Sequence, residues 1–274
     1  MRTSRVTVPE FRDKKARGER IAVLTAYDAT MAKLLDRGGV DALLIGDSLG
    51  MVVLGHESTL SVTLDDMIHH TRAVVRGSSR ALIIADMPFL SYQTSPADAV
   101  RNAGRLIQEG ATAVKVEGGQ PVLDAVERLV DVGIPVMAHL GLLPQSVNQL
   151  GGYRKQATTA AEADRLLSDA RALERAGVFS IVLESIPADV AAAVTRAVKV
   201  PTIGIGAGPD CDGQVLVSYD MLGLFDGFVP SFVKQYANLA DEVINATRSY
   251  VDEVRQQQFP ARAESVADID RSRR

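Results

Sequence analysis

The sequence predicts a protein of the α/β class, folded as a single closed barrel of eight parallel strands with helices between them, a (β/α)8 or TIM barrel. Short apolar runs rich in β-branched residues alternate with helical stretches, and seven such runs lie within residues 21–205. Alternating strands and helices form parallel sheets, and a count near eight indicates a closed barrel. The length of 274 residues also agrees with one such barrel, which takes about 250 residues.

The expected strands are apolar on both faces, as strands are when helices cover both sides of a parallel sheet. Seven strands are expected at residues 21–25, 40–45, 81–85, 112–116, 134–138, 179–183 and 200–205. An eighth strand, which would close the barrel, is expected around residues 228–233.

Several of the expected helices begin at a capping residue or a proline, and several are followed by glycine, which is the usual asymmetry of helix ends. Asp28 is a candidate N-cap, Pro96 and Pro121 stand at helix starts, and Gly110 and Gly133 follow helix ends. Helices are therefore expected at residues 28–37, 65–75, 96–109, 121–131, 159–176 and 187–198, with a closing helix at 238–254.

We expect one domain over residues 1–254, which includes a polar and basic N-terminal extension (residues 1–20), and a loose polar tail over residues 255–274. The extension lacks the apolar segment of a signal peptide, and no apolar run reaches the roughly 18 residues of a membrane span. These features predict a cytoplasmic protein without a membrane partner. The net charge of −4 argues against a nucleic-acid surface, and the single cysteine, Cys211, excludes an internal disulfide.

Polar and ionisable side chains follow five successive strands at their expected C-terminal ends. The set consists of Asp47, Ser48, Asp86, Lys115, Glu117, His139 and Glu184. A single acid after a strand is usually a helix cap or a loop residue, but a whole set of buried charges needs partners or a ligand. Because (β/α)8 barrels carry their active sites at the C-terminal ends of the strands, we expect these side chains to share one rim.

Three carboxylates, those of Asp47, Asp86 and Glu117, would repel one another at this rim unless a cation lies among them. Oxygen ligands select a hard divalent ion, so the sequence predicts a Mg2+ site. Glu184 lies a few strands away and is a candidate general base. Lys115 and His139 could bind a substrate carboxylate or stabilise a developing enolate.

Three other features favour structural roles. The GIGAG segment (204–208) follows the seventh strand, where barrels often bind phosphate, but a tight turn explains it at least as well. His69 and His70 are neighbours on a helix and point about 100° apart, so they would chelate one metal poorly. Cys211 has no neighbour in the sequence that would stabilise a thiolate, so we do not predict a nucleophile there.

Long segments of the chain resemble the ketopantoate hydroxymethyltransferase family, also called 3-methyl-2-oxobutanoate hydroxymethyltransferase. The resemblance covers about residues 3–260. It is carried by LTAYDAT (24–30), IGDSLGMVVLGHESTLSVTLDDMIHHTRAVVRG (45–77), IADMPFLSY (84–92), AVKVEGG (113–119), AHLGLLPQSVNQLGGYR (138–154), TIGIGAGPDCDGQVLVSYDMLGL (202–224) and FVKQYA (232–237). One departure is that the family usually has glycine shortly after the GGY motif, where this chain has QATT (156–159), with Ala157.

The resemblance implies a phosphoenolpyruvate-mutase-like barrel that transfers a hydroxymethyl group from 5,10-methylenetetrahydrofolate to 3-methyl-2-oxobutanoate. The product, 2-dehydropantoate, leads to pantothenate and coenzyme A. One Mg2+ per subunit and a homo-oligomer, often a decamer, are also implied. The resemblance implies metal ligands at Asp47 and Asp86, with Glu117 as a third contact through water. It implies substrate contacts at Asp47, Ser48, Asp86, Lys115 and His139. It also implies that Glu184 is the catalytic proton acceptor.

Three alternatives stay open at this point. A lyase of the same barrel group would share the metal-binding acids and would not need folate. An aldolase could instead use Lys115 to form a Schiff base with the oxoacid. A barrel without catalytic activity could bind a metabolite for regulation, although the complete set of acid, base and metal ligands argues against it.

Overall fold

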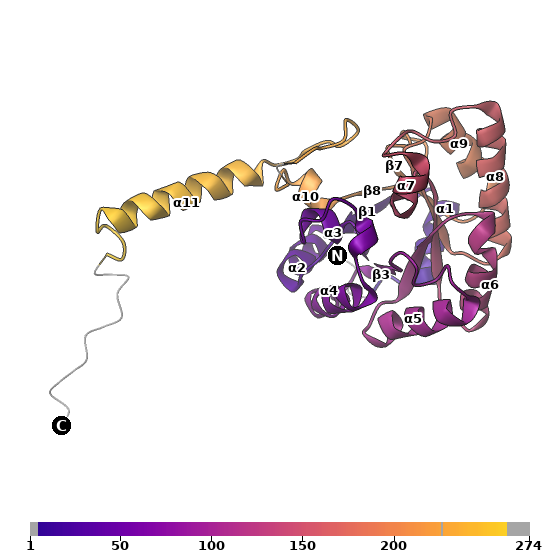
Figure 1. Cartoon of the computed structure of the whole chain (residues 1–274), viewed down its shortest axis with the longest axis horizontal. Helices are drawn as coiled ribbons and strands as arrows, with labels where there is room; N and C mark the ends of the chain where they lie inside the picture. Colours follow the sequence, from indigo (N-terminus) through magenta and orange to yellow (C-terminus); the bar gives the residue numbers. More distant parts are fainter. Residues whose placement is uncertain (1–4, 226, 262–274) are drawn as a thin grey trace, which may run out of the picture. The chain divides into compact units, whose positions relative to one another are not determined.

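Eight parallel strands form a closed barrel in chain order, β1-β2-β3-β4-β5-β6-β7-β8, in the computed structural model, which describes residues 5–225 and 227–261. Figure 1 shows helices α4, α5, α6, α8 and α9 around the strands. The predicted (β/α)8 barrel is therefore confirmed. The strands are β1 Ile21–Thr25, β2 Ala42–Ile45, β3 Leu82–Asp86, β4 Ala113–Glu117, β5 Val136–Gly141, β6 Ser180–Glu184, β7 Thr202–Ile205 and β8 Gly213–Leu216.

The eighth strand was predicted in the wrong place, around residues 228–233. Strand β8 lies instead at Gly213–Leu216 and pairs with both β7 and β1. It follows β7 without an intervening helix, is four residues long and contains the exposed Gln214, so it lacks the apolar pattern of the other strands. A Cβ atom at Gly213 would lie 2.4 Å from the carbonyl oxygen of Ile21, so only glycine allows this close approach of β8 to β1.

The predicted barrel helices are present within a few residues of their expected ends. Asp28 caps α2 by accepting a hydrogen bond from the Met31 amide at 2.8 Å, as the sequence indicated. The helices are α1 Val8–Ala16, α2 Ala29–Gly38, α3 Leu49–Val52, α4 Leu64–Gly77, α5 Pro96–Gln108, α6 Leu123–Asp131, α7 Val147–Leu150, α8 Ala160–Arg175, α9 Ala188–Ala197, α10 Ser218–Met221 and α11 Leu239–Arg255, with 3-10 turns at Thr59–Ser61, Gln120–Val122 and Pro144–Ser146.

The N-terminal extension contains a helix, α1, that the sequence analysis did not predict. Its Phe11 is fully buried and meets Phe179 edge to face, with ring centroids 5.7 Å apart. Phe11 belongs to an apolar cluster with Ile21, Leu82 and Met137, among others, from the strands. Because Phe179 directly precedes β6, the extension packs at the N-terminal end of the barrel. The opposite end, where the strands finish, is left for the polar side chains.

Asp36 joins the end of α2 to the segment that leads into β3. Its carboxylate accepts hydrogen bonds from the backbone amides of Ser79, Arg80 and Ala81, at 2.9, 3.1 and 2.7 Å. A negative charge near a helix C-terminus is unfavourable by itself, because that end of the helix dipole is negative. The hydrogen bonds from these three amides explain why an aspartate occupies the position. Burial alone would raise the pKa of Asp36, but the backbone hydrogen bonds lower it below the usual value.

Replacing Asp36 with alanine is expected to destabilise the fold by about 2–4 kcal/mol, because three partly buried amides lose a charged acceptor. The full loss of folding free energy should be seen above about pH 4, the pKa of an unfolded aspartate. It should shrink as the pH falls through the lower pKa of the folded state, where native Asp36 is itself protonated. Urea unfolding at several pH values would measure this, with Asp164→Ala, an exposed acid of α8, as the control. Equal effects of the two substitutions would contradict the prediction.

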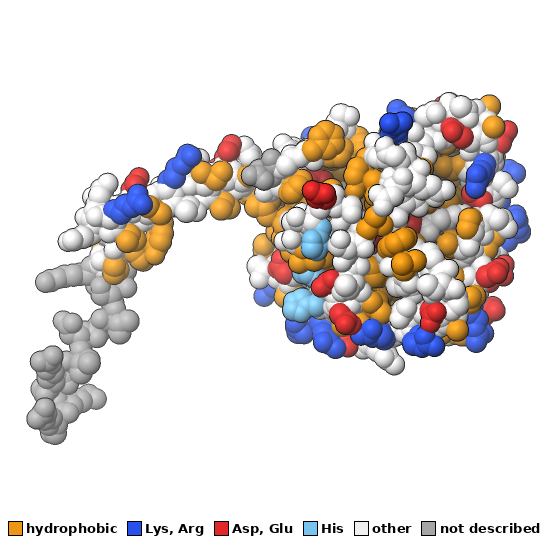
Figure 2. All heavy atoms as spheres, viewed as in Figure 1, with side chains coloured by type: hydrophobic (Ala, Val, Ile, Leu, Met, Phe, Trp, Pro, Cys, Tyr) orange, Lys and Arg blue, Asp and Glu red, His pale blue; other side chains and the backbone are white. Residues whose placement is uncertain are grey.

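The contacts between Cα atoms divide the chain into two compact units, residues 1–218 and 219–274. The predicted helix at 238–254 is confirmed as α11 and belongs to the second unit. The expected domain boundary at residue 254 stays a prediction, and most of the predicted tail, residues 262–274, lies outside the described residues. Over the described residues, no helix is both long and apolar enough to cross a membrane. Acidic and basic side chains are interspersed on the face of the first unit seen in Figure 2.

Candidate active site

The predicted site residues come together at the C-terminal ends of β2 to β6. Asp86 and Glu184 are the last residues of β3 and β6, and Asp47 follows β2. Strand pairing aligns Asp86 with Lys115 and Glu117 with His139, so neighbouring strands deliver these groups at the same level. Ser48 and Glu184 are partly exposed, and the other five are buried.

Lys115 and His139 link the acids into one continuous chain of contacts. Lys115 Nζ lies 3.2 Å from Asp86 Oδ1, 3.7 Å from Glu117 Oε1 and 3.2 Å from His139 Nδ1. On its other side, His139 Nε2 lies 3.1 Å from Glu184 Oε2, an ion-pair distance without hydrogen-bond geometry. Glu184 is thereby connected, through one histidine and one lysine, to Asp86 and Glu117, two of the three buried acids.

The electrostatics of this chain of contacts favour a positive charge on both Lys115 and His139. Burial alone would lower the pKa of Lys115, but the carboxylates of Asp86, Glu117 and Asp47 raise it above that of a solvated lysine. Burial and the charge of Lys115 oppose protonation of His139, but Glu117 and Glu184 raise its pKa to about 9. The ammonium of Lys115 therefore stays charged, and the imidazole of His139 is stabilised in its protonated form.

The three buried acids differ in their surroundings. Burial, together with the charges of Asp86 and Glu117, raises the pKa of Asp47 well above its usual range. Burial also raises the pKa of Asp86, against the opposing effects of Lys115 and the Asp47 amide. The pKa of Glu117 is lowered, because His139 and Lys115 outweigh its burial. Asp47 is thus the acid that most lacks a compensating positive charge.

Gln145, which the sequence analysis missed, connects two of these acids. Its side-chain amide donates to Asp47 Oδ2 and to the Met87 carbonyl, both at 2.9 Å. Its backbone amide donates to Glu117 Oε2 at 3.0 Å. The buried Tyr92 hydroxyl in turn donates to Gln145 Oε1 at 2.9 Å. Gln145 therefore orients the carboxylates of Asp47 and Glu117 from the loop that follows β5.

At the predicted Mg2+ site, replacing Gln145 with leucine should weaken Mg2+ binding by about 10–100-fold, because Asp47 loses the side-chain amide that orients it. The buried Met87 carbonyl and Tyr92 hydroxyl would also lose a partner, at a cost of about 1–3 kcal/mol of folding free energy. Calorimetric Mg2+ titration and urea unfolding would measure the two effects. Gln108→Leu, which changes an exposed amide at the end of α5, is the control, and matching results for both variants would contradict the prediction.

Ser48 is held by a second set of contacts. Its Oγ lies 2.9 Å from the hydroxyl of the buried Tyr27, and the carbonyl of Tyr27 lies 2.6 Å from His70 Nδ1. His70 therefore supports the strand-end segment that carries Tyr27, which agrees with the structural role predicted for it. His69 is exposed.

The remaining candidates also have local structural explanations. Gly206 and Gly208 of the GIGAG segment have φ values of 60° and 80°, as a tight turn requires. These values agree with the tight turn that the sequence analysis considered at least as good an explanation as phosphate binding. Cys211 is buried, and burial raises the pKa of its thiol, which opposes thiolate formation, as expected for a residue that is not a nucleophile.

The acids fit a Mg2+ ion that is completed by water or substrate oxygens. Among the residues that the structure describes, no three His, Cys, Asp or Glu side chains are arranged as a complete metal site. Mg2+ in proteins is commonly held by one or two carboxylates and keeps several other oxygen ligands. Asp47 and Asp86 match this pattern, because both are buried, and Asp86 Oδ1 accepts no hydrogen bond in the described structure, although the Lys115 ammonium lies 3.2 Å away as its ion-pair partner.

Comparisons with known proteins agree on one family. A family model described as ketopantoate hydroxymethyltransferase matches residues 5–262. A 3-methyl-2-oxobutanoate hydroxymethyltransferase of Moorella thermoacetica is 62% identical over 258 residues, which cover 94% of this chain and 96% of that protein. The protein of the same name from Caldicellulosiruptor saccharolyticus is 55% identical over 262 residues, which cover 96% and 99%.

Two solved structures with similar folds are a member of the phosphoenolpyruvate mutase and isocitrate lyase superfamily and a phosphoenolpyruvate phosphomutase. A 2,3-dimethylmalate lyase has a TM-score of 0.60 and 17% sequence identity, with 96% of this chain and 90% of that chain covered. A phosphoenolpyruvate phosphomutase from Streptomyces platensis subsp. rosaceus has a TM-score of 0.61 and 12% identity, with 96% and 92% covered. These likenesses confirm the predicted phosphoenolpyruvate-mutase-like barrel.

Proposed function

The chain belongs to the ketopantoate hydroxymethyltransferase family, and we propose that it transfers a hydroxymethyl group from 5,10-methylenetetrahydrofolate to 3-methyl-2-oxobutanoate. It is an enzyme of the transferase class. The product would be 2-dehydropantoate, used for pantothenate and coenzyme A. The observation that supports this most is the chain of contacts from Asp86 through Lys115 and His139 to Glu184. It places a candidate base and two cations at one rim.

The proposed reaction begins with binding of the oxoacid at the rim formed by Asp47, Ser48, Asp86 and Lys115. Asp47 and Asp86 would hold Mg2+, with Glu117 as a further contact through water. When bound, this ion would polarise the keto group of the substrate and so make its C3 proton more acidic. Lys115 adds positive charge where negative charge develops in the enolate.

Glu184 accepts the C3 proton in this proposal. Its carboxylate is partly exposed and in contact with His139, so it can face a substrate and remain oriented by the imidazole. The resulting carbanion attacks the methylene carbon of the folate donor and forms the new carbon–carbon bond. The two carbon–nitrogen bonds of this methylene carbon break, one as the new carbon–carbon bond forms and the other as water supplies the hydroxyl group of the product. The C3 proton accepted by Glu184 and the remaining proton of the water go to the two nitrogens, and tetrahydrofolate leaves.

The surroundings of Lys115 disfavour the Schiff-base alternative. A lysine that attacks a carbonyl must be neutral, and such lysines have a lowered pKa. The acids around Lys115 raise its pKa instead. Borohydride treatment in the presence of the oxoacid should therefore leave Lys115 unmodified. A covalent adduct on Lys115 would refute the proposed role.

The decisive test of the activity is product formation. The protein is incubated with Mg2+, 3-methyl-2-oxobutanoate and 5,10-methylenetetrahydrofolate, and the oxoacid is followed by mass spectrometry. We expect an oxoacid enlarged by CH2O, formed only when the donor is present. Cleavage of an oxoacid without the donor would favour a lyase, and an unchanged substrate in every mixture would favour a binding protein without catalytic activity.

We also propose that the chain forms a homo-oligomer, in line with the resemblance, with one Mg2+ per subunit. Helix α11 supports self-association, because no side chain of this helix is buried. Its Val243, Ile244, Tyr250 and Val254 are all more than 40% exposed. Sedimentation equilibrium would show a decamer if this proposal is correct and a monomer if it is wrong.

A further inference from the structure

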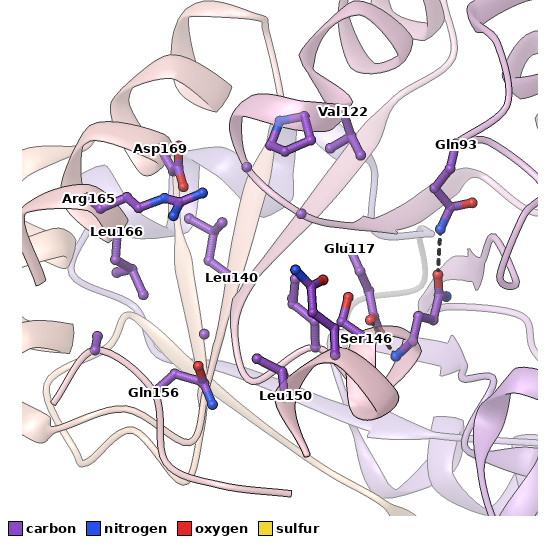
Figure 3. A pocket seen from close by; sticks show the side chains of 18 of the residues that line it. Gln93, Glu117, Val122, Leu140, Ser146, Leu150, Gln156, Arg165, Leu166 and Asp169 are labelled. Atoms are coloured by element: carbon purple, nitrogen blue, oxygen red, sulfur yellow. Dashed lines mark hydrogen bonds between the residues drawn. The ribbon is translucent and has the colours of Figure 1, made fainter. Parts of the chain in front are cut away.

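A cavity of about 510 Å3 lies beside the candidate active site, between the ends of β4 and β5 and helix α8 (Figure 3). Glu117 and Gln145 line this cavity, and each also contacts the rim, Glu117 through Lys115 and Gln145 through Asp47. The cavity therefore shares two of its lining residues with the polar rim where the oxoacid would bind. Its volume is within the range of sites that enclose organic cofactors and far exceeds the space that a five-carbon oxoacid needs.

The walls of the cavity are suited to a flat aromatic group. Leu140, Leu143, Leu150 and Val122 give it apolar surface, and Phe89 lines it while remaining 39% exposed. A ring that stacks on Phe89 and packs against these aliphatic side chains would bury a large apolar area. The side chains of Gln93, Gln149 and Gln156 also line the cavity and can bond to polar edges of such a ring.

The side of the cavity formed by α8 carries a cation. Figure 3 shows Arg165 and Asp169 on the side opposite Glu117 and Gln93. Arg165 is exposed, and the described structure records no ion pair or hydrogen bond for its guanidinium. The nearby acids have other partners, because Asp169 accepts from the Gln120 amide and Glu162 accepts from the amides of Thr158 and Thr159. Arg165 is thus available to an anionic group of a ligand.

We propose that this cavity binds the one-carbon donor, with the aromatic part of the folate along the apolar wall and a carboxylate of its glutamate tail at Arg165. The inference rests on the proposed function, which requires a donor to reach the oxoacid from a neighbouring site. A guanidinium pairs well with a carboxylate, through two parallel hydrogen bonds. The reacting methylene group would then lie toward Glu117 and Gln145, where the cavity meets the rim.

The test compares two donors that differ only in the tail, 5,10-methylenetetrahydrofolate and 5,10-methylenetetrahydropteroate, which lacks glutamate. Arg165→Ala is expected to raise the KM for the folate by about tenfold, the usual order for one charge-assisted hydrogen bond. The KM for the pteroate should change much less, because it has no glutamate carboxylates to lose contact with. Arg171→Ala is the matched control, since Arg171 is an exposed arginine of the same helix outside the cavity lining.

A second variant tests the cavity itself. Gln149 lines the cavity and is exposed, so Gln149→Trp should narrow it without disturbing the core, and should raise the KM for both donors. The inference would be overturned if Arg165→Ala and Gln149→Trp both kept the native KM values for both donors. The proposed function would still stand in that case, because the native protein forms product. Failure of the native protein to form product with either donor would instead refute the proposed function, and the inference with it.

Discussion

Replacing Glu184 with glutamine is expected to lower the rate of C3 proton exchange in 3-methyl-2-oxobutanoate by about 10²–10⁴-fold, the usual contribution of a general base. Glutamine keeps the shape of the side chain near His139 but has no group that accepts the proton. Proton NMR in D2O measures the exchange directly, without the folate donor. Binding of Mg2+ and the oxoacid should be retained, because Glu184 stands apart from Asp47 and Asp86 in the chain of contacts.

Glu127→Gln is the matched control for this prediction. Glu127 is an exposed glutamate of α6, so its loss should leave the exchange at the native rate. Rapid exchange in Glu184→Gln, close to that of Glu127→Gln, would show that another group removes the proton.

Replacing Lys115 with methionine should affect both stability and activity. Methionine has a similar length but leaves Asp86 and Glu117 buried without their ion-pair partner, which costs about 3–5 kcal/mol of folding free energy. Loss of the positive charge near the developing enolate should also slow the C3 exchange by about 10²–10³-fold. Urea unfolding and the NMR exchange assay measure the two effects, with the exposed Lys33→Met of α2 as the control.

Added Mg2+ gives this prediction a second readout. In Lys115→Met the three carboxylates lose one of their two cations and keep only His139, so Mg2+ should raise the melting temperature of the variant more than that of the native protein. A variant as stable as Lys33→Met, or one that gains no more from Mg2+ than the native protein, would contradict the role assigned to Lys115.

Most of the site residues could be predicted from the sequence, because they are charged and lie at the ends of apolar runs. Asp86, Lys115, Glu117, His139 and Glu184 each end or nearly end an apolar run, and a parallel barrel brings such positions to one rim. Gln145 could not be found in this way, because it is neutral and lies in a 3-10 turn after β5. Only its place in the segment AHLGLLPQSVNQLGGYR, which resembles the family, pointed to it.

Two parts of the fold lacked a signal in the sequence. Strand β8 is short, and its pairing depends on Gly213, whose missing side chain allows β1 to come close. Helix α1 is mostly polar, and Phe11 is its one fully buried side chain, so no apolar periodicity marked it. Ion pairs of Lys14 with Asp41 and of Lys15 with Asp212 also attach it to the barrel. Neither feature follows from local patterning, because both depend on contacts with distant parts of the chain.

The departure at Ala157 has a conformational consequence. Ala157 has a φ of 54°, in the left-handed region that favours glycine, at the position where the resemblance led us to expect glycine. The neighbouring Gln156 amide donates to the Ser185 carbonyl at 2.9 Å, which ties the loop to the end of β6. The strained backbone is therefore retained beside Glu184, and Ala157 lines the cavity assigned to the donor.

The central claim is that the polar rim removes the C3 proton of the oxoacid. The most direct measurement is hydrogen–deuterium exchange at C3 of 3-methyl-2-oxobutanoate by NMR, with and without Mg2+, in the presence and absence of tetrahydrofolate. We expect the native protein to catalyse exchange that depends on Mg2+ and is lost in Glu184→Gln. The absence of catalysed exchange in all four mixtures, or exchange at the native rate in Glu184→Gln, would contradict the claim.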